Sequence, residues 1–184
     1  MHKKLIILDR DGVINYDSDA YIKSVAQWQP IPGSIEAIAR LAKAGFMIGV
    51  ATNQSGIARG YFTLETLQAM HAKMIESVEQ AGGKIHAVSF CPHGPDDDCA
   101  CRKPRIGLLE EISRQVDIPL NQAYFIGDTA KDVEAARTAR ATPILVKTGK
   151  GERTLLKHPE LAKQIAVYDD LAAASLHLLQ GLPS

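Results

Sequence analysis

The stretch "LIILDRDG", residues 5–12, joins a run of four large apolar residues to a pair of aspartates. Apolar runs of this length are typical of strands that are buried on both faces of a parallel sheet. Asp9 and Asp11 follow the run at once, and Gly12 allows the chain to turn there. Two carboxylates so close together repel each other unless a cation or a shared proton lies with them. The stretch therefore predicts a buried strand with an acidic site at its end, although Asp-x-Asp-Gly is also common in ordinary surface turns.

The remaining apolar residues fall into alternating strand and helix patterns. Further strands are expected at 46–51, 85–90, 123–126, 143–147 and 165–168. Helices are expected at 34–44, from 63 to just before the Gly82-Gly83 pair, at 106–116, at 131–139 and from about 170. Ser34 is the expected N-cap of the first of these helices, Gly45 its stop, and Thr63 the start of the second. The alternation predicts an α/β protein with a Rossmann-like parallel sheet and helices on both of its faces.

Composition limits what the chain can bind and where it works. Its 184 residues suit a single domain, 1–184, that buries enough surface to fold without a covalent or metal link. Lys plus Arg and Asp plus Glu each number 21, so no basic field predicts nucleic acid or an anionic membrane as a partner. Asp9 ends the first apolar run too early for a signal peptide, and no apolar span of membrane length follows. Three cysteines, an odd number, fit a reducing compartment better than a set of disulfides. The sequence has no exposed apolar repeat of the kind that would indicate an interface with another chain. We therefore expect a cytoplasmic monomer.

Polar residues follow three of the expected strands at the point where ligands bind in parallel sheets. After the strand at 46–51, the turn 52–55 has hydroxyl, amide and backbone N–H groups that could hold an oxyanion. Arg102 and Lys103 form a basic pair suited to phosphate, although such pairs are usually solvated surface. Asp128 and Asp132 follow the strand at 123–126 and could simply cap the next helix. Together with Asp9, they could instead form the hard-oxygen site that Mg²⁺ prefers.

All three cysteines lie with a histidine in one short stretch, "CPHGPDDDCAC", residues 91–101. The pattern C-x-H-x5-C-x-C offers three thiolates and one imidazole, which make a closed tetrahedral zinc site without an open position. A closed site of this kind is structural, so the ion would brace the loop that leads into Arg102 and Lys103. A redox-active thiol cluster and a cluster without metal are the alternatives. The four expected zinc ligands are Cys91, His93, Cys99 and Cys101.

Four motifs, "LDRDG", "ATNQ", "RKP" and "IGDTAKD", occur in this order and together resemble the haloacid dehalogenase superfamily of phosphotransferases. The resemblance implies that Asp9 is the nucleophile that forms an aspartyl-phosphate and that Asp11 is the general acid and base. It implies that Mg²⁺ is held by the Asp9 carboxylate, the backbone carbonyl of Asp11 and Asp128. It also implies that Thr52 and Lys103 hold the phosphoryl oxygens and that Asp132 orders the site.

A zinc-stabilised binding module without catalysis would account for the cysteine cluster and for the expected fold. It would not account for the presence of all four motifs together. Within the superfamily, "CPH…CACRKP" is similar to small zinc-containing phosphatases, of which one branch acts on a heptose bisphosphate and another on histidinol phosphate.

The segment "TNQSGIARGYF", residues 52–62, resembles the heptose-bisphosphate branch. This resemblance implies removal of the 7-phosphate of D-glycero-D-manno-heptose 1,7-bisphosphate in ADP-heptose and lipopolysaccharide core assembly. Histidinol-phosphate phosphatase is the alternative.

Substrate choice in this superfamily often depends on an inserted cap domain, but here about 40 residues separate the first two motifs. A helix and a strand fill part of that length, which leaves only a loop, 15–33, and implies a capless fold. Relatives can carry a lysine where this chain has Thr129, which leaves open whether Lys131 replaces it. For the distal phosphate, Arg59 and Arg102 are the other candidates. The expected substrate-binding residues are Asp17, Ser18, Asp19, Tyr21, Asn53, Gln54, Ser55, Arg59 and Arg102.

Overall fold

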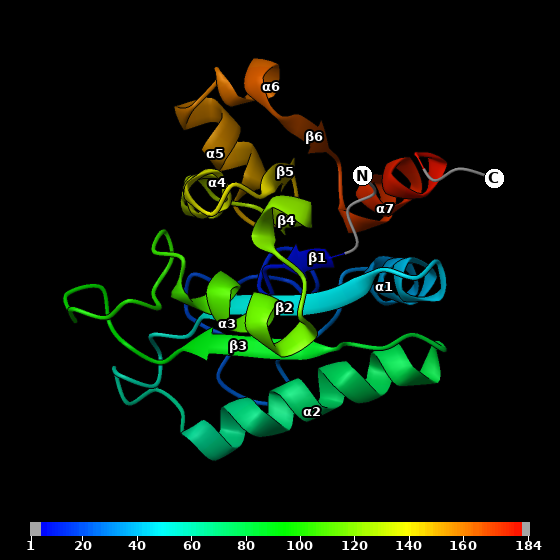
Figure 1. The fold of residues 1–184 in the computed structure, drawn as a ribbon. Helices are drawn as coiled ribbons and strands as arrows, with labels where there is room; N and C mark the ends of the chain where they lie inside the picture. The colour runs from blue at the N-terminus through cyan, green and yellow to red at the C-terminus, as the bar shows by residue number, and fades with distance from the viewer. Residues whose placement is uncertain (1–4, 182–184) are drawn as a thin grey trace.

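Six parallel strands form one sheet in the computed structural model, which describes residues 5–181 (Figure 1). They stand in the order β3-β2-β1-β4-β5-β6. Each predicted strand is present, and most bounds lie within one or two residues of the expected ones. The strands are β1 Leu5–Leu8, β2 Met47–Asn53, β3 Ala87–Cys91, β4 Ala123–Gly127, β5 Thr142–Val146 and β6 Ala166–Tyr168.

Helices cover both faces of the sheet, which confirms the predicted α/β architecture. Helices α1, α2 and α7 share one apolar core with the sheet, and α3 and α4 share another on the opposite face. The short helices α5 and α6 were not predicted, because each has too few residues to show a helical apolar period. The helices are α1 Ser34–Lys43, α2 Leu64–Gln80, α3 Gly107–Val116, α4 Ala130–Thr138, α5 Gly151–Lys157, α6 Leu161–Gln164 and α7 Leu171–Gln180, with a 3-10 turn η1 Leu120–Gln122 before β4.

Strand β1 is buried along its whole length, as its apolar run predicts. Ile6 and Leu8 point into the core under α1, α2 and α7, whereas Leu5 and Ile7 point into the core under α3 and α4. Side chains alternate along a strand, so a strand covered on both faces needs apolar residues at every position.

The start of α1 differs from the prediction that Ser34 is its N-cap. Gly33 holds that place with φ +84°, in the left-handed region that glycine tolerates. Ser34 is the first helical residue, and its buried hydroxyl donates to the carbonyl of Ile14 at 2.6 Å. Its hydroxyl is thus used in a tertiary contact instead of a cap. Thr63 does cap α2, since its Oγ1 accepts from the N–H of Thr66 at 3.2 Å.

The sheet order places a topological switch point between β1 and β4. The chain passes from β1 to β2 and β3 on one side, and then crosses over to build β4, β5 and β6 on the other. The N–H of Asp9 donates to the carbonyl of Ile126 at 2.9 Å, so the ends of β1 and β4 lie side by side. In open parallel sheets, ligands bind in the crevice that such a reversal opens at the carboxyl ends of the strands. Within residues 5–181, no helix combines the length and the apolar character that crossing a membrane requires.

Candidate active site

Three carboxylates meet at the switch point. Asp9 follows β1, Asp128 follows β4, and Asp132 lies in the first turn of α4. Oxygen atoms from the three side chains lie within 4.8 Å of one another. The Lys103 Nζ lies 3.0 Å from the Asp9 Oδ1 and 2.7 Å from the Asp132 Oδ1, and its side chain is only 3% exposed. One buried lysine is thus the counter-charge among three buried or half-buried carboxylates.

The pKa values show that the Lys103 charge does not balance the buried carboxylates. Burial raises the pKa of Asp9 to about 7, even though Lys103 opposes the shift. Burial, with the charges of Asp9 and Asp132, raises the pKa of Asp128 to about 8. For Lys103, burial alone would lower the pKa, but the Asp132 and Asp9 carboxylates outweigh it and raise it. The cluster is therefore suited to a further positive charge.

The free oxygens indicate which carboxylates could bind a divalent cation. Within residues 5–181, no donor contacts the Asp9 Oδ2 or the Asp128 Oδ1, whereas the Oδ1 of Asp9 accepts from Arg10 N–H and the Oδ2 of Asp128 from Lys150 N–H. Both carboxylate oxygens of Asp132 already accept hydrogen bonds: its Oδ1 accepts from Lys103, and its Oδ2 accepts three bonds. Two free carboxylate oxygens at one point are the ligand type that Mg²⁺ prefers, so Asp9 and Asp128 fit that ion.

Asp132 instead organises the turn between β4 and α4. Its Oδ2 accepts from the N–H of Asp128 at 3.2 Å and from the N–H and the hydroxyl of Thr129 at 3.1 and 2.7 Å. Thr129 accepts in return from the N–H of Asp132, which completes a capping box at the start of α4. Thr129 is therefore the N-cap of α4.

Two glycines leave room for the Asp128 carboxylate, because glycine has no side chain. Gly12 has φ +85°, and a Cβ there would lie 2.2 Å from the Asp128 Oδ2. Gly149 has φ +59°, and its Cβ would lie 2.3 Å from the same oxygen. The hydroxyl of Thr148 donates to the carbonyl of Gly12 at 2.7 Å, which holds the segment after β5 against the first motif. Sequence analysis missed this segment, although its glycines directly after a strand were a usable signal.

Asp11 is held by three neighbouring side chains. Its carboxylate accepts from the Arg10 Nε at 2.9 Å, from the Asn15 Nδ2 at 2.8 Å and from the Gln54 Nε2 at 3.0 Å. Burial alone would raise the pKa of Asp11, but the Arg10 charge and these hydrogen bonds together lower it. These contacts therefore favour the ionised form of Asp11 and fix the direction of its carboxylate. Arg10 and Asn15 were not predicted as site residues.

The end of β2 and the turn that follows it serve the site in two ways; Thr52 and Asn53, expected in the turn, are the last two residues of the strand. Thr52 and Gln54 are buried at the cavity, and the Gln54 Nε2 donates to the Thr52 Oγ1 at 2.8 Å. Asn53, expected to contact substrate, uses its side chain on the backbone of Lys103: its Oδ1 accepts from the Lys103 N–H at 3.0 Å and its Nδ2 donates to the Lys103 carbonyl at 3.1 Å. Ser55 is buried at the cavity wall. Asn53 thus positions Lys103.

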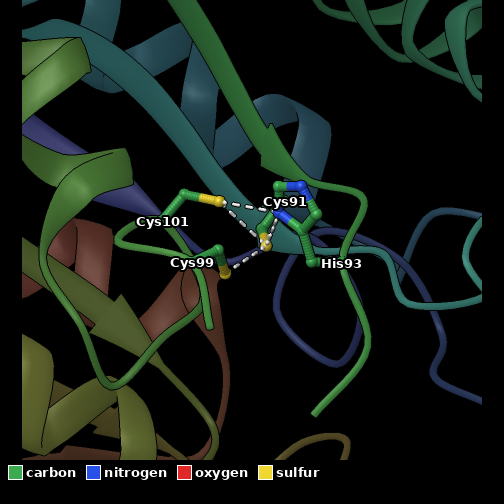
Figure 2. A group of neighbouring side chains, drawn as sticks. All are labelled: Cys91, His93, Cys99 and Cys101. Atoms are coloured by element: carbon green, nitrogen blue, oxygen red, sulfur yellow. Dashed lines mark hydrogen bonds between the residues drawn. The ribbon is translucent and has the colours of Figure 1, made fainter. Parts of the chain in front are cut away.

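The cysteine cluster converges on one point, as Figure 2 shows. The Sγ of Cys91 lies 3.7 Å from that of Cys99 and 3.0 Å from that of Cys101. The Nδ1 of His93 lies 3.5 Å from the Sγ of Cys91 and 3.3 Å from that of Cys101. A tetrahedral zinc ion with Zn–S bonds of about 2.3 Å separates its sulfur ligands by about 3.8 Å. The four side chains therefore fit zinc after a small movement of Cys101, and all three cysteines are free thiols.

The cluster lies next to the residues that hold Lys103. Cys91 ends β3 and pairs with Asn53 of β2 in the sheet. Cys101 precedes Lys103 by two residues, and the Arg105 guanidinium donates to the carbonyl of Cys99. A brace at residues 91–101 would therefore stiffen the backbone from which Lys103 reaches Asp9.

A cavity of about 620 Å³ opens over the carboxylates. Arg59 is not among its lining residues and is exposed, whereas Arg102 and Lys131 line it. The predicted site residues that line it are Asp9, Asp11, Asp17, Ser18, Asp19, Tyr21, Thr52, Asn53, Gln54, Ser55, Arg102, Lys103, Asp128 and Asp132. Lining residues that sequence analysis missed are Lys150, Arg153, Thr154, Lys157 and His158, which lie on or beside α5.

The loop 15–33, which contributes Asp17, Asp19 and Tyr21 to the cavity lining, is tied to two other segments of the chain. The Lys150 Nζ lies 3.2 Å from the Asp17 Oδ2, and the Arg153 Nη2 lies 3.1 Å from the Asp19 Oδ1. The Tyr21 ring lies 5.0 Å from that of Tyr61, measured between centroids. The loop therefore forms one wall of the cavity.

Comparison with known proteins agrees with the fold. A family model described as HAD-hydrolase-like matches residues 100–174. This match, the switch point and the acidic cluster define a hydrolase of the haloacid dehalogenase class. A D-glycero-beta-D-manno-heptose-1,7-bisphosphate 7-phosphatase from Pseudomonas putida is 55% identical over 176 residues, 96% of this chain and 99% of the relative. A relative of the same name from Pseudomonas aeruginosa is 54% identical over 98% of this chain and its own full length.

A solved structure extends this likeness to three dimensions. The D,D-heptose 1,7-bisphosphate phosphatase of B. bronchiseptica, complexed with magnesium and phosphate, has a TM-score of 0.92 and 49% identity, and covers 97% of this chain and 99% of its own. This chain belongs to the family of the heptose 1,7-bisphosphate 7-phosphatases. The capless Rossmann-like fold expected from the sequence is confirmed.

Magnesium binding is expected to tighten as the pH rises. Asp9 and Asp128 must lose their protons to act as ligands, and their pKa values are raised to about 7 and about 8. Below this range protons compete for the two carboxylates, and above it both are charged. Titration of the metal-free protein should therefore give an apparent Kd for Mg²⁺ that falls about tenfold or more between about pH 6 and about pH 8. The same titration of Asp9→Asn should show a weaker pH dependence, and a pH-independent Kd in the wild type would contradict the ligand assignment.

Proposed function

We propose that this chain removes the 7-phosphate of D-glycero-β-D-manno-heptose 1,7-bisphosphate through an aspartyl-phosphate intermediate. The observation that carries the proposal is the Asp9 carboxylate, which has one free oxygen and lies against Lys103 at the base of the cavity. The substrate and its β anomer come from the names of relatives that match this chain over nearly its whole length. The product would serve ADP-heptose and lipopolysaccharide core assembly.

In the first step, a carboxylate oxygen of Asp9 attacks the phosphorus atom, and the bond from phosphorus to the sugar oxygen breaks. The Lys103 ammonium and the Thr52 hydroxyl hold the phosphoryl oxygens as their charge is redistributed. Asp11 protonates the departing sugar oxygen. Asp11 is ionised in the structure, so the negative charge of the bound phosphate must raise its pKa for it to carry that proton.

In the second step, Asp11 accepts a proton from water, and the water oxygen attacks the phosphorus of the aspartyl-phosphate. The bond from phosphorus to the Asp9 oxygen breaks, which restores the Asp9 carboxylate and releases inorganic phosphate. The hydrogen bonds from Arg10, Asn15 and Gln54 suit Asp11 to this role, because they keep its carboxylate ionised and oriented.

Two metal ions are part of the proposal. Asp9, Asp128 and the backbone carbonyl of Asp11 would hold Mg²⁺, which, when bound, offsets negative charge on the phosphoryl group and the carboxylates. The relative from B. bronchiseptica is described as complexed with magnesium and phosphate. The four ligands at 91–101 would hold a structural Zn²⁺. We further propose one domain, 1–184, that works as a cytoplasmic monomer.

The second phosphate of the substrate would lie among the cations that line the outer part of the cavity. Arg153 and Lys157 are both exposed on α5, and Lys131 and Arg102 line the same cavity. Arg153 holds Asp19 in this structure, an exposed ion pair that a phosphate dianion can replace, because exposed pairs contribute little stability. We therefore propose that the distal phosphate contacts α5 instead of Arg59.

Arg153→Ala is expected to weaken binding of the bisphosphate alone. The KM for the heptose bisphosphate should rise about tenfold, the loss expected for one charge-assisted hydrogen bond. The KM for an aryl monophosphate, which lacks the second phosphate, should stay unchanged. Arg114→Ala, an exposed arginine on α3 outside the cavity lining, is the matched control. A rise in KM for Arg59→Ala and not for Arg153→Ala would support the sequence-based candidate.

The function itself is tested by measuring phosphate release with Mg²⁺ from heptose 1,7-bisphosphate and from histidinol phosphate, side by side. A kcat/KM about a hundredfold or more higher for the bisphosphate is expected, since the proposed contacts on α5 would hold a second phosphate that histidinol phosphate lacks. The α and β anomers should be compared in the same assay. The reverse preference would favour the histidinol-phosphate alternative and would leave the roles of Asp9 and Asp11 intact.

A further inference from the structure

A buried chain of side chains runs from Asp11 away from the cavity and into the core. Arg10 is fully buried, although it lies between two aspartates of the site. Its Nε and Nη2 contact the Asp11 carboxylate at 2.9 and 2.8 Å. Its Nη1 lies 3.3 Å from the Nε2 of His71 on α2. The guanidinium is thus held at one end by Asp11 and at the other by His71.

His71 is a polar residue in the apolar face of α2. Leu67 and Met74, one turn before it and almost one turn after it, are fully buried, and His71 itself is 7% exposed. Its ring lies 6.0 Å from that of Phe90. Burial, together with the positive charge of Arg10, lowers the pKa of His71 to about 3, so the ring is neutral. A neutral ring can offer its Nε2 lone pair to the Arg10 N–H, which makes His71 an acceptor here.

We propose that His71 is a positioning residue for the phosphatase reaction and that it acts on Asp11 through Arg10. A buried N–H without an acceptor is costly, so a guanidinium that loses His71 turns towards another acceptor. The planar guanidinium binds the carboxylate through two N–H groups, and its rotation therefore moves Asp11 with it. Displacing a catalytic group by about 1 Å can cost on the order of a hundredfold in rate. A histidine that only fills space in the core would have no such effect.

An aryl phosphate is the substrate with which a displaced Asp11 should affect the second step of the reaction alone. An aryl oxide leaves without needing a proton, so the first step with this substrate needs little from Asp11. Hydrolysis of the aspartyl-phosphate still needs Asp11 to take the proton of water. Loss of its position should therefore slow the second step alone and cause the phosphorylated protein to accumulate.

The test compares His71→Phe, which keeps an aromatic ring but has no acceptor, with His71→Gln, whose amide oxygen can accept from Arg10. With an aryl phosphate and Mg²⁺, His71→Phe should lower kcat about 10- to 100-fold and lower KM with it, so that kcat/KM changes little, because only the step after phosphoryl transfer is slowed. Acid-quenched samples should contain protein heavier by one phosphoryl group. His71→Gln should restore most of kcat and remove that species. If His71→Phe does not fold, Arg10→Lys, which keeps the charge without the planar pair of donors, should show the same accumulation.

The proposal rests on the aspartyl-phosphate mechanism, but the aryl phosphate arm does not depend on the heptose substrate. Wild-type kcat and no accumulated phosphoprotein in a folded His71→Phe would overturn it. Equal losses of kcat in His71→Phe and His71→Gln would also overturn it, because they would show that the ring matters only for packing. A protein that hydrolyses the aryl phosphate but not the heptose bisphosphate would overturn the substrate assignment and leave this inference standing.

Discussion

Asp9→Asn should abolish turnover, with a loss of roughly 10⁴-fold or more in kcat, as for other covalent nucleophiles. The amide cannot attack phosphorus, so no aspartyl-phosphate forms. Folding should be unharmed, because burial already raises the pKa of Asp9 to about 7 and the change removes a charge that repels Asp128 and Asp132. Lys103 keeps Asp132 as its partner. Rates of phosphate release and thermal unfolding on the same preparation measure both effects.

Asp96→Asn makes the same chemical change at an exposed position and is the matched control, with wild-type kcat and Tm expected. If the Asp9→Asn variant retained more than about a tenth of the wild-type kcat, another group would have to be the one that attacks phosphorus. A large fall in its Tm would mean instead that the Asp9–Lys103 pair stabilises the fold, since breaking a buried pair can cost about 3–5 kcal/mol.

Cys99→Ser should lower zinc content, thermal stability and activity together. The change removes one of the four proposed ligands, and the three that remain would hold zinc less tightly. The loop 91–101 then loses its brace, and with it the backbone that leads to Lys103. The Asn53 side chain still forms hydrogen bonds to both the N–H and the carbonyl of Lys103, so activity should fall only about tenfold. This loss is within the 10–100-fold range expected when a supporting contact at a metal site is removed. Zinc per chain, Tm and kcat are the measurements.

The Ala100→Ser variant is the matched control. It adds a hydroxyl between Cys99 and Cys101 without removing a thiol, so the variant should keep its zinc. A Cys99→Ser protein that remains fully loaded with zinc would remove Cys99 from the ligand set. Zinc loss with lower Tm but unchanged kcat would show that the ion stabilises the loop without positioning Lys103.

Local patterns account for the part of the fold that could be predicted. A strand such as β1 shows itself as an unbroken apolar run because both of its faces are covered, and helices such as α1 repeat their apolar residues every turn. The motif aspartates could be predicted because they directly follow such strands. Helix α5 has too few turns to show a period, so Arg153 and Lys157 were missed with it.

The sequence by itself determined the order of strands and helices, the acidic residues at the ends of β1 and β4, and the four side chains of the cysteine cluster. These features depend on neighbours within a few residues, which a single sequence displays. Only the tertiary structure decided that Asn53 would hold Lys103, that Gly149 would make room for Asp128, and that His71 would contact Arg10. Each of these pairs lies far apart in the chain and meets only because the sheet is ordered β3-β2-β1-β4-β5-β6. A buried polar group takes whichever partner the packing brings within hydrogen-bonding distance, and local periodicity does not specify that partner.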